Sequence, residues 1–165
     1  MRPDLKKTQL VQSPADHRRY HALTLNNGSR VLLVEQADAE KSAAAMSVNV
    51  GHFDDPADRE GLAHFLEHLV FLGSRQFPEP GDYAQFISAH GGSHNAWTGT
   101  EHSCFYFDIE DDAFAAGLER FADMLGAPLF AEASVQKERQ AIEAEFSMKL
   151  KDDGRRIYQA HKETI

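Results

Sequence analysis

The residues of this sequence best suited to chemistry are His64, Glu67 and His68, which lie within the five consecutive positions His-Phe-Leu-Glu-His. Histidines four positions apart on a helix project from one face, with Cβ atoms about 5–6 Å apart. Two imidazoles arranged in this way can share one metal ion. Pairs at this spacing also arise by chance on solvated or core helices, so the pair is informative only together with its neighbours.

Zinc favours nitrogen ligands of this kind. A catalytic zinc takes three protein ligands and leaves one position for water. Glu67 precedes His68 by one position. It is near enough to reach that water without binding the metal, so its expected role is that of general base. A metal-activated water attacks polarised carbonyls, and the pattern therefore points to hydrolysis.

A third ligand must come from another element, and the predicted helix over 134–150 offers candidates. Glu138 and Glu145 are seven positions apart, about two turns, and so share a face, whereas Glu143 is rotated by roughly 160° from Glu145. One of the pair can bind the metal while the other accepts a hydrogen bond from a histidine and orients it. Spacing alone does not decide which does which. Without the histidines, Glu138 and Glu145 would be typical of an exposed acidic helix face.

The elements that must hold these residues include several short strands. Asn26-Asn27-Gly28 supplies turn residues between two β-rich runs, which predicts a hairpin. Alternating apolar and polar residues predict a third strand, and a second pair follows the glycines Gly91-Gly92. The predicted strands cover 20–25, 31–34, 43–50, 93–100 and 104–109.

Helical periodicity connects and follows these strands. Asp55-Pro56 offers an N-cap and a first-turn proline for the helix that carries the histidines, which we expect to continue to Gly73. Ser134 is the expected N-cap of the acidic helix. The other predicted helices cover 82–89, 114–125 and a final segment from 155.

Composition limits the classes of function. The 165 residues include 17 Lys and Arg and 26 Asp and Glu, which gives a formal net charge of −9. This charge repels nucleic acid and anionic lipid surfaces, so we expect neither as a partner. Cys104 is the single cysteine, which excludes an internal disulfide and a cysteine-rich zinc module. The length fits one domain over 1–165, without an interdomain linker.

The two ends of the sequence suggest where the protein works and how complete it is. No signal peptide is visible in 1–11 and no apolar run is long enough to span a membrane. We therefore expect a cytoplasmic protein for the chain as given, and a periplasmic one if a leader is missing. The sequence stops at Ile165 directly after a helical pattern, without a breaker or cap. This suggests a fragment of a longer protein.

Several blocks of the sequence carry a resemblance to a known family. His64-Phe65-Leu66-Glu67-His68 is the inverzincin signature, the reverse of the commoner zinc-peptidase order. Together with Val50–Pro56, Glu60–Leu62, Phe71–Gly73 and Gly91–Thr98, it resembles the pitrilysin and insulin-degrading-enzyme group of M16 metallopeptidases. The similarity runs from about Tyr20 to the last residue.

The resemblance implies a role for each candidate residue. His64, His68 and Glu145 become the ligands of one zinc ion, Glu67 the catalytic base, and Glu138 a supporting carboxylate. Asn95 matches a family position on an edge strand that contributes to substrate binding. The implied function is that of a zinc metalloendopeptidase that hydrolyses peptides and small proteins.

The resemblance also implies an architecture. The expected fold is α+β, an antiparallel sheet covered by helices as in the N-terminal domain of M16 enzymes (LuxS/MPP-like), which agrees with the elements predicted above. Members of the group have four such units in two halves that enclose a chamber. The sequence then covers an incomplete first unit, and its partners are the peptide substrate and the missing C-terminal half.

Two other functions deserve comparison. A non-catalytic M16 relative could serve as a structural or peptide-binding subunit, but such relatives lose members of the zinc motif, and all four residues are present here. A purely structural zinc site is disfavoured because it needs a fourth protein ligand and has no use for Glu67.

Overall fold

The computed structural model describes residues 11–162 and 164, in two compact units that divide after Glu40. The first unit contains an antiparallel hairpin of β1 (Arg19–Thr24) and β2 (Arg30–Glu35). Its turn uses a left-handed glycine, Gly28, with φ of 87°. The hairpin predicted around Asn26-Asn27-Gly28 is therefore confirmed.

The second unit is built on a three-stranded antiparallel sheet in the order β3-β5-β4. Its strands are β3 (Lys41–Val48), β4 (Ser93–Thr98) and β5 (Ser103–Glu110). Along the central strand β5, buried residues alternate with less buried ones, so one face of the sheet points to the core. All three strands lie where alternation predicts them, with ends shifted by up to two residues.

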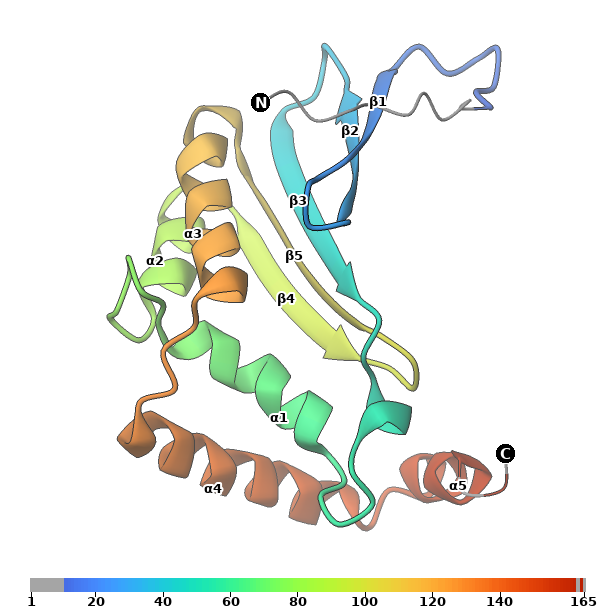
Figure 1. Cartoon of the computed structure of the whole chain (residues 1–165), viewed down its shortest axis with the longest axis vertical. Helices are drawn as coiled ribbons and strands as arrows, with labels where there is room; N and C mark the ends of the chain where they lie inside the picture. The colour runs from blue at the N-terminus through green and yellow to red at the C-terminus, as the bar shows by residue number, and fades with distance from the viewer. Residues whose placement is uncertain (1–10, 163, 165) are drawn as a thin grey trace. The chain divides into compact units, whose positions relative to one another are not determined.

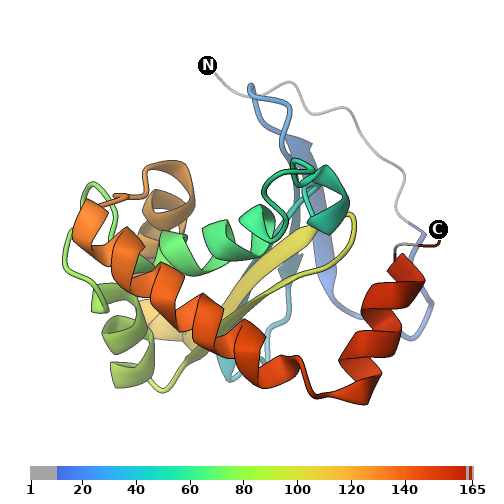
Figure 2. The same ribbon diagram turned by 90° about the horizontal axis from the view of Figure 1, so that it is seen from below.

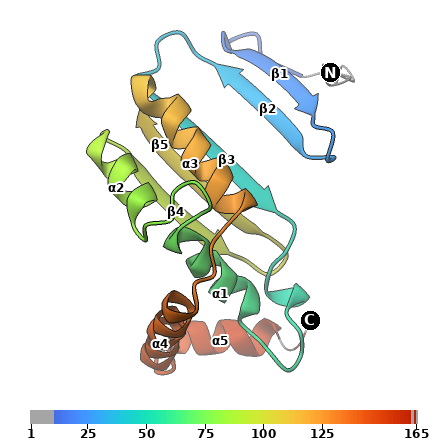
Figure 3. The same ribbon diagram turned by 60° about the vertical axis from the view of Figure 1, so that its left-hand side comes forward.

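Helices cover the buried face of this sheet. α2 (Asp82–Ala89) and α3 (Phe114–Gly126) pack on it, as Figures 1 and 3 show. Phe107 and Ile109 from β5 meet Ile87 of α2 and Phe121 of α3 in the core. Burial of these large apolar side chains supplies the main driving force for this layer. The α+β class, an antiparallel sheet covered by helices, is thus confirmed.

The helix that carries the histidines begins later than predicted. α1 spans Leu62–Leu69 and continues as the short 3₁₀ helix η2 (Val70–Leu72), which ends at Gly73. The expected start at Asp55-Pro56 is wrong, because 55–61 form a loop that follows the 3₁₀ helix η1 (His52–Asp54). Asp55 nevertheless caps the helix from a distance, as described below.

The C-terminal part of the second unit is helical. After the 3₁₀ helix η3 (Asp111–Ala113) and α3, the chain forms α4 (Glu132–Lys149) and α5 (Asp153–Lys162). The predicted N-cap Ser134 is wrong, because Ala131 holds that position and Ser134 lies inside α4. α5 begins two residues before its predicted start. Figure 2 shows α4 running beside α1. No helix in the described part of the chain is both long and apolar enough to cross a membrane.

A close backbone approach at Gly51 joins the start of the η1 loop to the turn after β4. A Cβ at this buried residue would lie 2.6 Å from the carbonyl oxygens of Gly99 and Thr100. We predict that Gly51→Ala lowers the free energy of unfolding by about 1–3 kcal/mol, the usual cost of overpacking. Urea denaturation measures the change.

The matched control is Gly126→Ala. This glycine is helical, and a Cβ added to it would have no other atom within 4 Å, so alanine should leave stability equal or higher. Equal stability of Gly51→Ala and the unsubstituted protein would show that the close approach is not maintained in solution.

Candidate metal centre

The two histidines of α1 point their rings toward each other. The Nε2 atoms of His64 and His68 lie 3.2 Å apart, and the ring centroids are 4.7 Å apart in an edge-on arrangement. Glu67, on the same helix, is buried with 8% of its surface exposed. One helix of eight residues therefore supplies two nitrogen donors and a buried carboxylate.

Asp55 fixes the first turn of α1. One of its carboxylate oxygens accepts a hydrogen bond from the Gly61 backbone N–H and the other accepts one from Ala63, both at 2.8 Å. N–H groups at the start of a helix have no acceptor within the helix, so they need one from elsewhere. The carboxylate thereby holds the turn immediately before His64.

The 3₁₀ helix η1, which directly precedes Asp55, is itself anchored to the sheet. The backbone N–H groups of His52 and Phe53 donate to the carbonyl oxygens of Gly99 and Thr100, at 2.9 and 2.8 Å. These acceptors lie in the turn between β4 and β5. The start of α1 is thus tied to the same strand pair against which the helix packs.

α4 presents one partly buried stripe toward α1. Glu138 Oε1 lies 2.9 Å from His68 Nδ1, and Glu145 Oε2 lies 3.9 Å from His68 Nε2. The other carboxylate oxygen of Glu145 pairs with Lys149. The partly buried residues that form this stripe are Ser134, Val135, Glu138, Ile142, Glu145 and Lys149.

Glu138 fixes which ring nitrogen of His68 donates to it. A carboxylate can only accept, so His68 Nδ1 donates in its contact with Glu138, and Nε2 is the nitrogen directed toward His64 and Glu145. Burial lowers the pKa of His64, and the neighbouring His68 lowers it further. Both effects favour a neutral His64 imidazole, the form that binds metals.

Three donors from two helices converge at this point. His64, His68 and Glu145 each offer one ligand atom, and all three atoms lie within 4.8 Å of one another. Two nitrogens bound to a tetrahedral zinc at about 2.0–2.1 Å lie about 3.3 Å apart, close to the 3.2 Å between the two Nε2 atoms. The kinds of donor and the spacing of the two histidine nitrogens therefore fit a zinc ion.

Comparisons with known proteins identify the family of this chain. Residues 30–164 match Insulinase, peptidase family M16. The chain is 38% identical to human insulin-degrading enzyme over 164 residues, which are 98% of this chain and 16% of that protein. It is 41% identical to protease 3 of Escherichia coli K12 over 154 residues, 93% of this chain and 16% of that protein.

This chain belongs to peptidase family M16.

Two solved protease structures are similar to this chain in fold as well as in sequence. The structure of pitrilysin superposes with a TM-score of 0.89 at 39% identity, over 99% of this chain and 17% of pitrilysin. A protease from Helicobacter pylori gives a TM-score of 0.71 at 25% identity, over 78% of this chain and 30% of that protease. This M16 chain thus spans about a sixth of the length of the curated relatives that it matches.

Asn95 makes no side-chain hydrogen bond to any of the three donors in the described part of the chain. It is exposed on β4, and its side-chain oxygen accepts a hydrogen bond from the backbone N–H of the next residue, Ala96, at 2.9 Å.

The contact of Thr98, on the same strand, with Glu67 was not predicted from the sequence. Its hydroxyl donates to Glu67, and no periodicity could have indicated this contact, because it depends on how β4 packs against α1.

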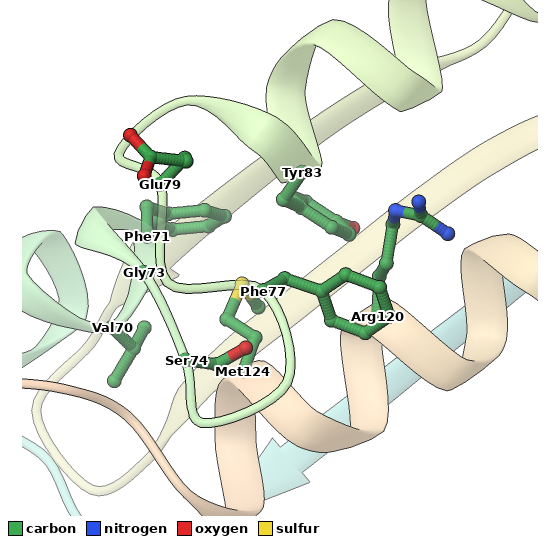
Figure 4. A pocket seen from close by; sticks show the side chains of 9 residues that line it. All are labelled: Val70, Phe71, Gly73, Ser74, Phe77, Glu79, Tyr83, Arg120 and Met124. Atoms are coloured by element: carbon green, nitrogen blue, oxygen red, sulfur yellow. The ribbon is translucent and has the colours of Figure 1, made fainter.

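A separate pocket lies beside the loop after η2, and Figure 4 shows the side chains around it. Tyr83 and Met124 line it, and the Arg120 guanidinium lies 4.3 Å from the centroid of the Phe77 ring. The buried Tyr83 hydroxyl has no hydrogen-bond partner among the described residues. None of the three candidate metal ligands lines this pocket, so it is separate from the candidate metal centre.

The cap at the start of α1 gives a direct test of how the histidines are held. We predict that Asp55→Ala lowers the free energy of unfolding by about 1–2 kcal/mol, because two backbone N–H groups lose their acceptor. Thermal or urea unfolding measures this. Asp58→Ala is the control, since the Asp58 side chain is 78% exposed. Equal effects of the two substitutions would contradict a specific cap.

Proposed function

We propose that this chain is the zinc-binding catalytic portion of a metalloendopeptidase that hydrolyses peptide bonds in peptides and small proteins. The observation that carries the proposal is the convergence of two imidazoles and one carboxylate beside a buried glutamate on the same helix. Membership of family M16, whose relatives include insulin-degrading enzyme and protease 3, supports the same reaction class.

In this proposal His64, His68 and Glu145 hold one zinc ion. Glu138 keeps the proton of His68 on Nδ1 and so keeps Nε2 directed at the metal. Only three donors converge among the described residues, and a structural zinc site takes four. The incomplete protein ligand set favours a catalytic site over a structural one.

Bound zinc would polarise the peptide carbonyl and lower the pKa of a water molecule. Glu67 is the group that accepts the proton from that water, and it then delivers the proton to the leaving amine. Its burial keeps bulk water away from the carboxylate, and Thr98 occupies one of its two oxygens. The other oxygen is available for proton transfer.

The rest of the enzyme completes the substrate site in this proposal. We assign residues 1–165 to an N-terminal zinc-binding domain of a longer enzyme, because the matched relatives are about six times longer. Asn95, exposed on β4, contributes to peptide binding, and the C-terminal half supplies further substrate-binding groups. These assignments rest on the resemblance to the family.

We predict that Glu145→Gln removes tight zinc binding, whereas Glu138→Gln weakens it by about 10–100-fold, the range for a residue that only orients a ligand. Competition with a chromophoric chelator measures the affinities. Glu143→Gln, an exposed change on the same helix, is the control. If Glu138→Gln had the larger effect, the two glutamates would exchange roles.

Glu67→Gln separates metal binding from catalysis, because the amide keeps the shape but cannot accept a proton. We expect normal zinc content and a fall in turnover of about 10²–10⁴-fold. Peptide hydrolysis is measured with the longest gene product that carries this sequence, with Glu143→Gln as control. Zinc binding without any hydrolysis by the unsubstituted protein would instead favour a peptide-binding role.

A further inference from the structure

The carboxylate of Glu67 has a hydrogen-bond donor on the neighbouring strand. The Thr98 hydroxyl at the end of β4 donates to Glu67 Oε2. Glu67 is 8% exposed, and this is its one side-chain hydrogen bond within the described residues. A buried carboxylate without a donor is costly, so this bond matters for the position of the side chain.

The direction of this bond is fixed by the available protons. A carboxylate has none to give, so the single proton of the Thr98 hydroxyl lies on the side of Glu67. The Ser103 hydroxyl lies 2.9 Å from the Val50 carbonyl oxygen and 3.3 Å from Thr98 Oγ1. Its proton goes to one of these two acceptors, and neither choice takes the Thr98 proton away from Glu67.

The donor is held by regular structure rather than by a free loop. Thr98 is paired with Ser103 in the β4–β5 register, directly before the turn that receives the loop at the start of α1. The strand that carries the donor and the helix that carries the acceptor are in contact. Groups that are fixed in this way stay close to one position, as catalysis requires.

We propose that Thr98 is a positioning residue for Glu67, holding one carboxylate oxygen so that the other is the oxygen that exchanges the proton. The proposal rests on the proposed role of Glu67 as general base. Without the Thr98 hydroxyl, the carboxylate rotates among several orientations, and the productive one is populated for only part of the time. The consequence falls on turnover rather than on substrate or metal binding.

The test compares Thr98→Val, which removes the hydroxyl at nearly constant shape, with Thr98→Ser, which retains it. We expect Thr98→Val to lower kcat by about 10–100-fold, the range for removing an orienting partner in a metal site. KM and zinc content stay unchanged, and Thr98→Ser recovers most of the activity. Thr24→Val, the same chemical change at an exposed strand position, is the control.

A crystal structure of the zinc-loaded Thr98→Val protein gives a readout that does not depend on activity. We expect the Glu67 carboxylate in a different or a mixed rotamer, while Thr98→Ser keeps the orientation described here. If Thr98→Val does not fold at the assay temperature, Thr98→Ala, which adds no bulk, provides the same comparison.

Unchanged kcat in Thr98→Val would overturn the proposal, as would equal losses in the valine and serine variants, since these would indicate packing. Adding Thr98→Val to Glu67→Gln should cause no further loss, because Thr98 acts through Glu67; additive losses would also overturn it. Full activity of Glu67→Gln alone would instead refute the proposed function of Glu67, independently of Thr98.

Discussion

The burial of the Glu67 carboxylate between α1 and β4 is the constraint on which this site depends. A charged group removed from water must be compensated locally, and here a single hydroxyl from the edge strand provides the compensation. The contact joins α1 to β4, and the two histidines of α1 lie on the side that α4 covers. The helix is therefore located by a polar contact as well as by apolar packing.

The start of α1 is held by hydrogen bonds to its backbone N–H groups and by backbone contacts of the segment before it. The Asp55 carboxylate accepts hydrogen bonds from two N–H groups at the helix start, and the preceding η1 donates two backbone N–H groups to the β4–β5 turn. Gly51 permits this approach because a Cβ would collide with two carbonyl oxygens. Fixed backbone contacts of this kind hold a helix terminus more tightly than long flexible side chains, which lose entropy when they are ordered.

α4 carries the proposed ligand Glu145 and has little hydrophobic anchoring. None of its residues is buried, and its inner stripe mixes Val135 and Ile142 with Glu138 and Glu145. The carboxylates gain favourable contacts with His68, and Glu145 also pairs with Lys149. A metal ion shared between α1 and α4 would add a bond between the two helices, so metal binding and the docking of α4 are expected to support each other.

Most strands and helices could be predicted from the sequence because their signals are local. The alternation in β5, the Asn26-Asn27-Gly28 turn and the span of α2 each depend on neighbouring residues only. The prediction for the start of α1 was wrong for the same reason. Asp55-Pro56 has the local pattern of a helix start, but Asp55 instead reaches six and eight positions ahead to cap Gly61 and Ala63.

The sequence by itself determined that His64, Glu67 and His68 share one helix, and that Glu138 and Glu145 share one face of another. Helical periodicity is set by backbone geometry, so these relations follow from spacing alone. Only the tertiary structure decided that α4 packs on α1, that Glu138 meets His68 Nδ1, and that Thr98 reaches Glu67. These contacts join residues 31–70 positions apart, and their formation depends on packing over the whole unit, which no local pattern encodes.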